Sequence, residues 1–123
     1  MPIIRSTDAP TFTMGHATFT GFAAPSRGAK ETCVWRTRLQ PGAAPAEHSF
    51  SNEEVLVAVA GAAVASLDGV EHHIAAGDAV IVPAGTLFSL ANPHGEPFEA
   101  IVALPVGAVA YMGGEELVPP PAR

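Results

Sequence analysis

Cysteine is almost missing from this chain, which has Cys33 as its one thiol in 123 residues. A single cysteine cannot form an internal disulfide bond. The opening segment, MPIIRSTDAP, also lacks the apolar stretch behind basic residues that marks a secretory signal. These absences favour a reducing compartment, and we expect a cytoplasmic protein.

Charged residues, and basic ones above all, are scarce. Six lysines and arginines stand against twelve acidic residues, the formal net charge is −6, and the basic residues never form a dense run. We therefore expect no nucleic-acid binding. Charged residues make up 15% of the chain, compared with about 25% in an average domain. Much of the chain must then face an interior or a partner, and we expect a homodimer.

The chain has no apolar run of the roughly 20 residues that a membrane-spanning helix needs. The uncharged run from Val55 to Leu67 is too short, and the one from Ala79 to Gly95 is broken by prolines and a glycine. We expect no membrane span. The length fits one domain over residues 1–123, with a core near residues 31–105. We expect the N-terminal strand and the proline-rich C-terminal tail to lie in the dimer interface.

Turn residues are abundant, with twelve glycines and twelve prolines. Four glycines recur every eight residues, at Gly61, Gly69, Gly77 and Gly85. The segments between them leave room for strands of about five residues, the usual strand length. Further strands are predicted in TFTMGHATFTGF, ETCVWRTRLQ, TLFSLAN and PFEAIVALP, which are rich in β-branched or aromatic residues. The pattern predicts an all-β barrel or sandwich of about eight to ten strands.

A helix through EEVLVAVAGAAVASL is the competing interpretation, because alanine favours helices and a glutamate pair suits a helix N-terminus. The alternation of Val55, Val57 and Val59 favours a strand instead, and Gly61 interrupts the run where a hairpin turn would lie.

One spaced motif begins after the predicted third strand. Gly42, His48, Phe50, Glu54 and Gly61 fall at the spacing G-x5-H-x-H-x3-E-x6-G, with phenylalanine in place of the second histidine. This pattern resembles the first motif of the cupin superfamily.

A second motif follows. Gly77, Pro83, Gly85, Phe88 and Asn92 fit G-x5-P-x-G-x2-H-x3-N, the second cupin motif, again with phenylalanine in place of histidine. The resemblance implies a single-domain, jelly-roll-like cupin β-barrel of two antiparallel sheets, with its site inside the barrel mouth.

The resemblance also implies a metal site in which His48, Glu54 and two further histidines would hold the ion. Here Phe50 and Phe88 stand at the other two positions, and a phenyl ring has no lone pair to donate. We therefore expect no cofactor, and we expect the two phenyl rings to contact each other in an apolar pocket. A divalent transition metal held by His48, Glu54 and an unidentified group remains the alternative.

Three functions follow for the pair formed by His48 and Glu54. In the first, His48 transfers a proton and Glu54 orients it, as in an isomerase or cyclase acting on a small molecule. In the second, the protein is a mononuclear metal enzyme of the oxygenase type with an incomplete ligand set. In the third, the pair lies in a non-enzymatic ligand-binding or sensory domain. All three involve a small-molecule ligand.

Trp35 is the remaining candidate for lining the pocket, together with Phe50 and Phe88. It shares strand parity with Cys33 and Leu39, and the position of Leu39 before Pro41 favours this set as the inward one. Other residues carry weaker signals. We expect a solvated strand for His72 and His73, a position near the barrel mouth for His16 or His94, a buried thiol for Cys33, and an outward position for Arg36 and Arg38.

Overall fold

The chain folds almost entirely into antiparallel strands. The computed structural model describes residues 2–123, which contain two short 3-10 turns, η1 (Pro25–Arg27) and η2 (Pro120–Ala122), and no α-helix. In that range no helix has the length and apolar character to cross a membrane. The strands are β1 (Thr11–Met14), β2 (Ala17–Ala23), β3 (Thr32–Leu39), β4 (Ser49–Phe50), β5 (Glu54–Ala60), β6 (Ala62–Leu67), β7 (Val70–Ala75), β8 (Ala79–Val82), β9 (Phe88–Ala91), β10 (Phe98–Pro105), β11 (Ala110–Met112) and β12 (Glu115–Leu117).

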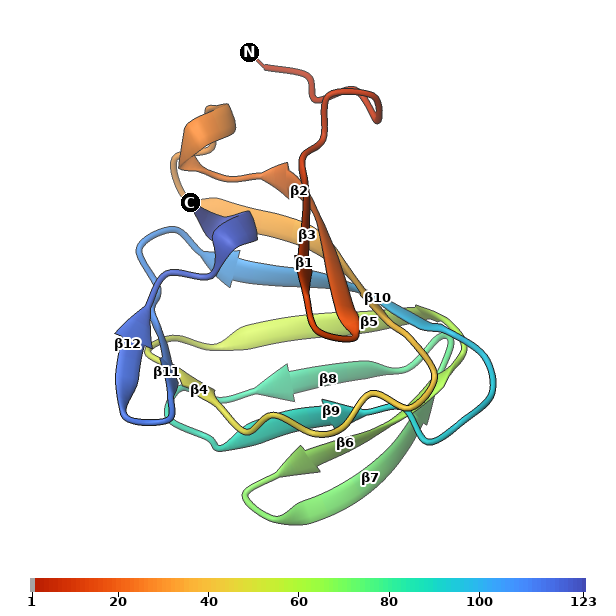
Figure 1. The fold of residues 1–123 in the computed structure, drawn as a ribbon. Helices are drawn as coiled ribbons and strands as arrows, with labels where there is room; N and C mark the ends of the chain where they lie inside the picture. Colours follow the sequence, from red (N-terminus) through yellow and green to blue (C-terminus); the bar gives the residue numbers. More distant parts are fainter. Residues whose placement is uncertain (1) are drawn as a thin grey trace.

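The strands form two layers around a common interior (Figure 1). One layer is a six-stranded sheet in the order β1-β2-β3-β10-β5-β8. The other consists of two three-stranded sheets, β12-β11-β4 and β7-β6-β9. An antiparallel bridge between His48 and Phe88 joins these two small sheets edge to edge. The predicted all-β jelly-roll architecture is therefore confirmed.

The predicted strand through residues 54–60 is confirmed, and the competing helix is wrong. Along β5, Leu56 and Ala58 are buried whereas Val57 and Val59 are exposed, which is the two-residue period of a strand. Gly61 follows at φ +73°, where a side chain would be strained, and an ideal Cβ there would collide with the carbonyl oxygen of Pro97. Turn geometry and sheet packing therefore determine the structure of this segment, in spite of its helix propensity.

The chain contains more strands than the sequence predicted. The segment TFTMGHATFTGF forms two strands, β1 and β2, which turn at Gly15. A further pair of strands lies near the C-terminus, where β11 and β12 form a hairpin around Gly113 and Gly114. Both glycines have positive φ, at +58° and +81°. A Gly-Gly pair suits such a tight two-residue turn.

The last residues pack on their own chain, beside β2 and β3 (Figure 1). Pro121 and Ala122 are buried there. Arg27 donates a hydrogen bond through Nη2 to the carbonyl oxygen of Pro121 at 3.2 Å, and Ser26 Oγ donates to the carbonyl oxygen of Arg123 at 2.6 Å. These contacts fix the C-terminal segment against the six-stranded sheet. A role for this segment in a dimer interface stays a prediction.

Asn92, the last residue of the second motif, links separate segments of the chain through hydrogen bonds. It is fully buried, and its Nδ2 donates to the carbonyl oxygens of Leu39 at 3.1 Å and Glu96 at 2.8 Å. Its main chain also exchanges hydrogen bonds with Gly42 and Ala43, where the first motif begins. The start of the first motif is therefore hydrogen-bonded to the end of the second.

Candidate functional site

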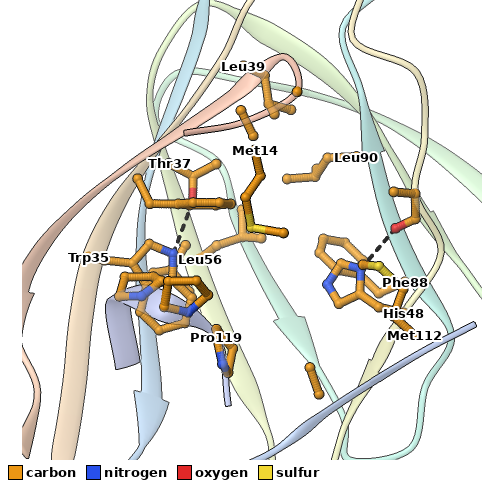
Figure 2. Close-up of a pocket in the computed structure, with 18 of the residues that line it drawn as sticks. Met14, Trp35, Thr37, Leu39, His48, Leu56, Phe88, Leu90, Met112 and Pro119 are labelled. Carbon is orange, nitrogen blue, oxygen red and sulfur yellow. Dashed lines mark hydrogen bonds between the residues drawn. The ribbon is translucent and has the colours of Figure 1, made fainter. Parts of the chain in front are cut away.

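A cavity of about 570 Å³ lies between the two layers, and its wall is mostly apolar (Figure 2). This volume is within the range of small-molecule pockets. The large side chains that line it are Met14, Phe19, Trp35, Leu39, Phe50, Leu56, Phe88, Leu90 and Met112. The sequence-predicted residues His48, Glu54, Phe50, Phe88 and Trp35 all lie in this wall.

The six-stranded sheet forms one wall through inward-facing residues in register. Trp35 on β3 pairs with Val102 on β10, which pairs in turn with Leu56 on β5. The inward parity favoured for Trp35 is confirmed, since it is buried while Arg36 and Arg38 are exposed. The indole Nε1 donates to Thr37 Oγ1 at 3.1 Å, so Trp35 presents its ring rather than its polar atom to the cavity.

His48 stands in the opposite wall, and the environment fixes its tautomer. Its Nδ1 lies 2.9 Å from the carbonyl oxygen of Ala46. A carbonyl oxygen can only accept a hydrogen bond, so Nδ1 carries the proton. Burial lowers the pKa of the imidazole, partly offset by this hydrogen bond, which favours the neutral ring. The other nitrogen, Nε2, then keeps its lone pair and faces the cavity (Figure 2).

The two phenylalanines at the ligand positions pack against the imidazole. The ring centroids of His48 and Phe50 are 5.3 Å apart at an interplanar angle of 88°, and those of His48 and Phe88 are 5.6 Å apart at 71°. Both are edge-to-face arrangements, which aromatic rings favour. We expected the two phenyl rings to contact each other; the ring contacts found among residues 2–123 join each of them to the imidazole instead.

Glu54 begins β5 and points into the cavity, whereas Glu53 is exposed, as the motif spacing predicted. Its side chain is only 4% exposed, and its Oε1 has no hydrogen-bond partner among residues 2–123. Burial raises the pKa of this carboxyl group to about 7. Near neutral pH a large share of Glu54 is therefore a neutral carboxylic acid.

The predicted orienting contact between Glu54 and His48 is absent from the described chain. The carbonyl oxygen of Ala46 holds Nδ1 instead. The reason is local: Ala46 is two residues before His48, so its carbonyl reaches the ring without any long-range packing. Glu54 is thereby left without the histidine partner that the sequence suggested, and its Oε1 stays unpaired among residues 2–123.

The side chains do not fit the metal that the cupin motifs imply. Transition-metal sites in proteins rely on three or four donors, and here Phe50 and Phe88 replace two of them. His16 also lines the cavity. Even so, residues 2–123 contain no group of three or more histidine, cysteine, aspartate or glutamate side chains placed to hold a metal ion.

The remaining histidines and the cysteine that the sequence singled out lie outside the cavity wall. His72 and His73 are exposed on β7, as expected, and His94 is exposed in a turn outside the cavity wall. Cys33 is buried, and its thiol lies 3.6 Å from the carbonyl oxygen of Ala122. Burial raises the pKa of this thiol, so it is not activated as a nucleophile.

Sequence reasoning missed the part of the wall that the C-terminal segment supplies. Leu117, Pro119, Pro120 and Pro121 all line the cavity. The signal that would have located them is the Gly113-Gly114 pair, which predicts a hairpin and so returns the chain to the barrel.

Comparison with protein families decides the assignment. The cupin domain model, Cupin_2, matches residues 35–104, more than half of the chain. This chain belongs to the cupin family. The resemblance drawn from the two motifs is therefore confirmed. A comparison with curated protein sequences found no significant match.

Several solved cupin structures share the fold. The polyketide cyclase RemF from Streptomyces resistomycificus matches with a TM-score of 0.76 and 17% identity, over 98% of this chain and 82% of that chain. A sugar phosphate isomerase from Silicibacter pomeroyi matches with a TM-score of 0.73 and 20% identity, over 93% of this chain and 83% of that one. Salicylate 1,2-dioxygenase from Pseudoaminobacter salicylatoxidans matches with a TM-score of 0.71 and 16% identity, over 86% of this cupin and 31% of the dioxygenase. At these identities the likeness shows the fold alone.

Proposed function

We propose that this cupin is a small-molecule enzyme that isomerises or cyclises a carbonyl compound, with His48 as general base and Glu54 as general acid. The observation that carries the proposal is the pairing, in one apolar cavity, of a neutral imidazole nitrogen and a buried carboxyl oxygen without a partner. A buried polar group without a hydrogen bond costs about 1–3 kcal/mol, which favours a role for Glu54 other than packing.

His48 suits the base role because its surroundings fix which ring nitrogen carries the proton. Nδ1 holds its hydrogen against Ala46, and burial keeps the ring neutral, so Nε2 is free to accept a proton. Packing of Phe50 and Phe88 on the imidazole helps to hold the ring in one orientation. A base fixed in this way needs no reorganisation when a substrate binds.

Glu54 suits the acid role because its raised pKa retains a proton near neutral pH. Its O–H would donate to the carbonyl oxygen of the substrate, where negative charge develops as an enol forms. This replaces the role of orienting residue that the sequence suggested.

The reaction begins with transfer of a proton from the carbon beside the carbonyl to Nε2 of His48, while Glu54 passes its own proton to the carbonyl oxygen, so that the C–H bond breaks and the enol forms. In an isomerisation, His48 returns its proton to a different carbon of the conjugated enol, and the enol O–H proton returns to Glu54 as the carbonyl re-forms. In a cyclisation, the enol carbon attacks a second carbonyl of the same molecule and forms a C–C bond, His48 gives its proton to the new hydroxyl oxygen, and the enol O–H proton returns to Glu54. Two of the structural neighbours are named as a cyclase and an isomerase, in accord with these reaction types.

Exchange of carbon-bound hydrogen in D₂O tests the proposal without knowledge of the natural substrate. The probe is 2-tetralone, a bicyclic ketone, and ¹H NMR follows loss of its α-proton signal. We expect wild-type protein to accelerate the exchange, and His48→Gln to lower the catalysed rate by about 100-fold or more. His72→Gln, which changes an exposed histidine outside the cavity, is the matched control. Equal exchange rates for wild type and His48→Gln would overturn the proposal in favour of a ligand-binding domain without catalysis.

A further inference from the structure

We infer that the cavity selects an uncharged aromatic ligand with a carbonyl or hydroxyl oxygen, and that it rejects phosphorylated and carboxylate-bearing molecules. This inference rests on the proposed function, because it names the substrate class of the same site. The observation behind it is that the fold places no lysine or arginine side chain of residues 2–123 in the wall of the cavity.

No lysine or arginine lines the cavity among the residues that the structure describes. Strand β3 explains this most directly: its alternation turns Trp35 and Thr37 inward and places Arg36 and Arg38 on the exposed outer face. The two guanidinium groups nearest in sequence to the cavity wall are thereby removed from it.

The remaining basic side chains are also accounted for. Arg27 donates to the carbonyl oxygens of Phe22 and Pro121, each at 3.2 Å, and Arg123 donates to that of Val118 at 2.9 Å. Arg5 and Lys30 are exposed and lie outside the cavity wall. An anion that entered the cavity would lose its hydration without meeting a lysine or an arginine side chain.

Such an exchange is unfavourable, because an ionised group moved into an apolar site without a partner costs several kcal/mol. The acidic side chain in the wall, Glu54, adds repulsion whenever it is ionised. A phosphate or carboxylate is therefore disfavoured by both desolvation and charge.

The wall favours flat, aromatic ligands. Trp35 lines the cavity with its N–H bound to Thr37, and Phe19, which pairs with Thr37 across β2 and β3, lines the same side. Figure 2 shows Trp35 and Thr37 across the cavity from His48 and Phe88. Aromatic rings placed between such walls gain from ring contacts in addition to burial. The polar pair, His48 and Glu54, leaves room for one oxygen function on the ligand.

Isothermal titration calorimetry with three matched probes at pH 6.5 tests the inference. 2-Naphthol is uncharged, 2-naphthoate carries one carboxylate and 2-naphthyl phosphate carries a phosphate on the same ring system. We expect 2-naphthol to bind with 1:1 stoichiometry and both anions to bind about tenfold more weakly or worse. An anion that binds as tightly as 2-naphthol, or failure of all three probes to bind, would overturn the inference.

A charge placed in the wall gives an independent test. Met14 lines the cavity and is 48% exposed, so Met14→Arg adds a cation at the mouth where the side chain also reaches solvent. We expect this variant to narrow the affinity gap between 2-naphthol and 2-naphthoate. Ile81→Arg adds the same charge on the outer face of β8, at a residue 61% exposed, and should leave the gap unchanged. Equal effects of the two variants would show that general electrostatics, and not the cavity, sets the preference.

Failure of this inference is distinguishable from failure of the proposed function. Preferred binding of an anion with hydrogen exchange still dependent on His48 would overturn the ligand class alone. Preferred binding of 2-naphthol with exchange independent of His48 would keep the ligand class and remove the catalytic role.

Discussion

His48 and Phe88 exchange two backbone hydrogen bonds, with N–O distances of 2.9 Å from His48 to Phe88 and 2.7 Å from Phe88 to His48. This pair joins the two small sheets and places the first and second cupin motifs side by side. Residues opposed in this way project their side chains to the same face of the sheet, and the two rings are in contact accordingly. One position of each motif, His48 and Phe88, is thus brought to the same face of the sheet.

Restoring the two histidines should therefore create a metal site. We expect the double variant Phe50→His/Phe88→His to bind about one equivalent of zinc, nickel or manganese, because His48 and Glu54 would complete a set of four donors. Elemental analysis after dialysis measures the metal content. Adding His48→Ala to the double variant is the control and should abolish the binding. A double variant without bound metal would show that these four positions do not converge as ligands.

The rate of catalysed exchange should follow a bell-shaped pH profile. His48 must be neutral, and burial holds its pKa below 6.5, so activity falls only at lower pH. Glu54 must be protonated, so kcat/KM should fall as the pH rises through about 7. Glu54→Gln keeps a hydrogen-bond donor that does not titrate, and this variant should lose the alkaline limb. A wild-type profile that rises steadily from pH 6 to pH 9 would contradict the assignment of Glu54 as the acid.

Glu54 should also make the fold less stable at alkaline pH. Its pKa in the folded state, about 7, lies above its ordinary value of 4.5, so the folded protein binds this proton more tightly than the unfolded chain. Stability from this group is full below pH 4.5 and is lost as the pH rises through 7. Between pH 5 and pH 8 the free energy of unfolding of the wild type should fall by about 2–3 kcal/mol relative to that of Glu54→Gln, as measured by urea unfolding. Parallel pH dependences of the two proteins would indicate that Glu54 is not protonated in the fold.

Gly61 should tolerate substitution far less than Gly69 does. Both have positive φ, at +73° and +83°, so alanine is strained at either position. At Gly61 an added Cβ would also meet the carbonyl oxygen of Pro97 and lie 3.1 Å from Phe98 Cα, whereas Gly69 has no atom within 4 Å. We expect Gly61→Ala to lower the free energy of unfolding by about 2 kcal/mol more than Gly69→Ala does, as measured by chemical unfolding. Similar costs would mean that the backbone at Pro97 moves freely away.

Much of the fold was predictable because short-range rules decide it. Gly61, Gly77 and Gly85 have the positive φ that their turn positions require, and the strands between them follow. The inward parity of Trp35 followed from alternation along one strand. Such features depend on residues that are neighbours in sequence.

The chemistry of the site was less predictable, because it depends on contacts that spacing does not specify. Motif spacing placed His48 and Glu54 at one cavity, but it did not reveal that Ala46 would hold Nδ1 and leave Glu54 without a partner. The contribution of Pro121 to the cavity was also hidden, since it depends on where a distant hairpin directs the chain. Side-chain hydrogen bonds and long-range packing decide these points.

The position of Trp35 has a practical consequence. It is the chain's single tryptophan, it lies in the cavity wall, and its N–H is hydrogen-bonded to Thr37. All of the indole fluorescence therefore originates beside the site. A bound molecule that displaces water from the ring or accepts its excitation energy would alter that emission, with no background from other tryptophans. The protein thus contains its own optical reporter, and libraries of unmodified compounds can be screened on it without a label.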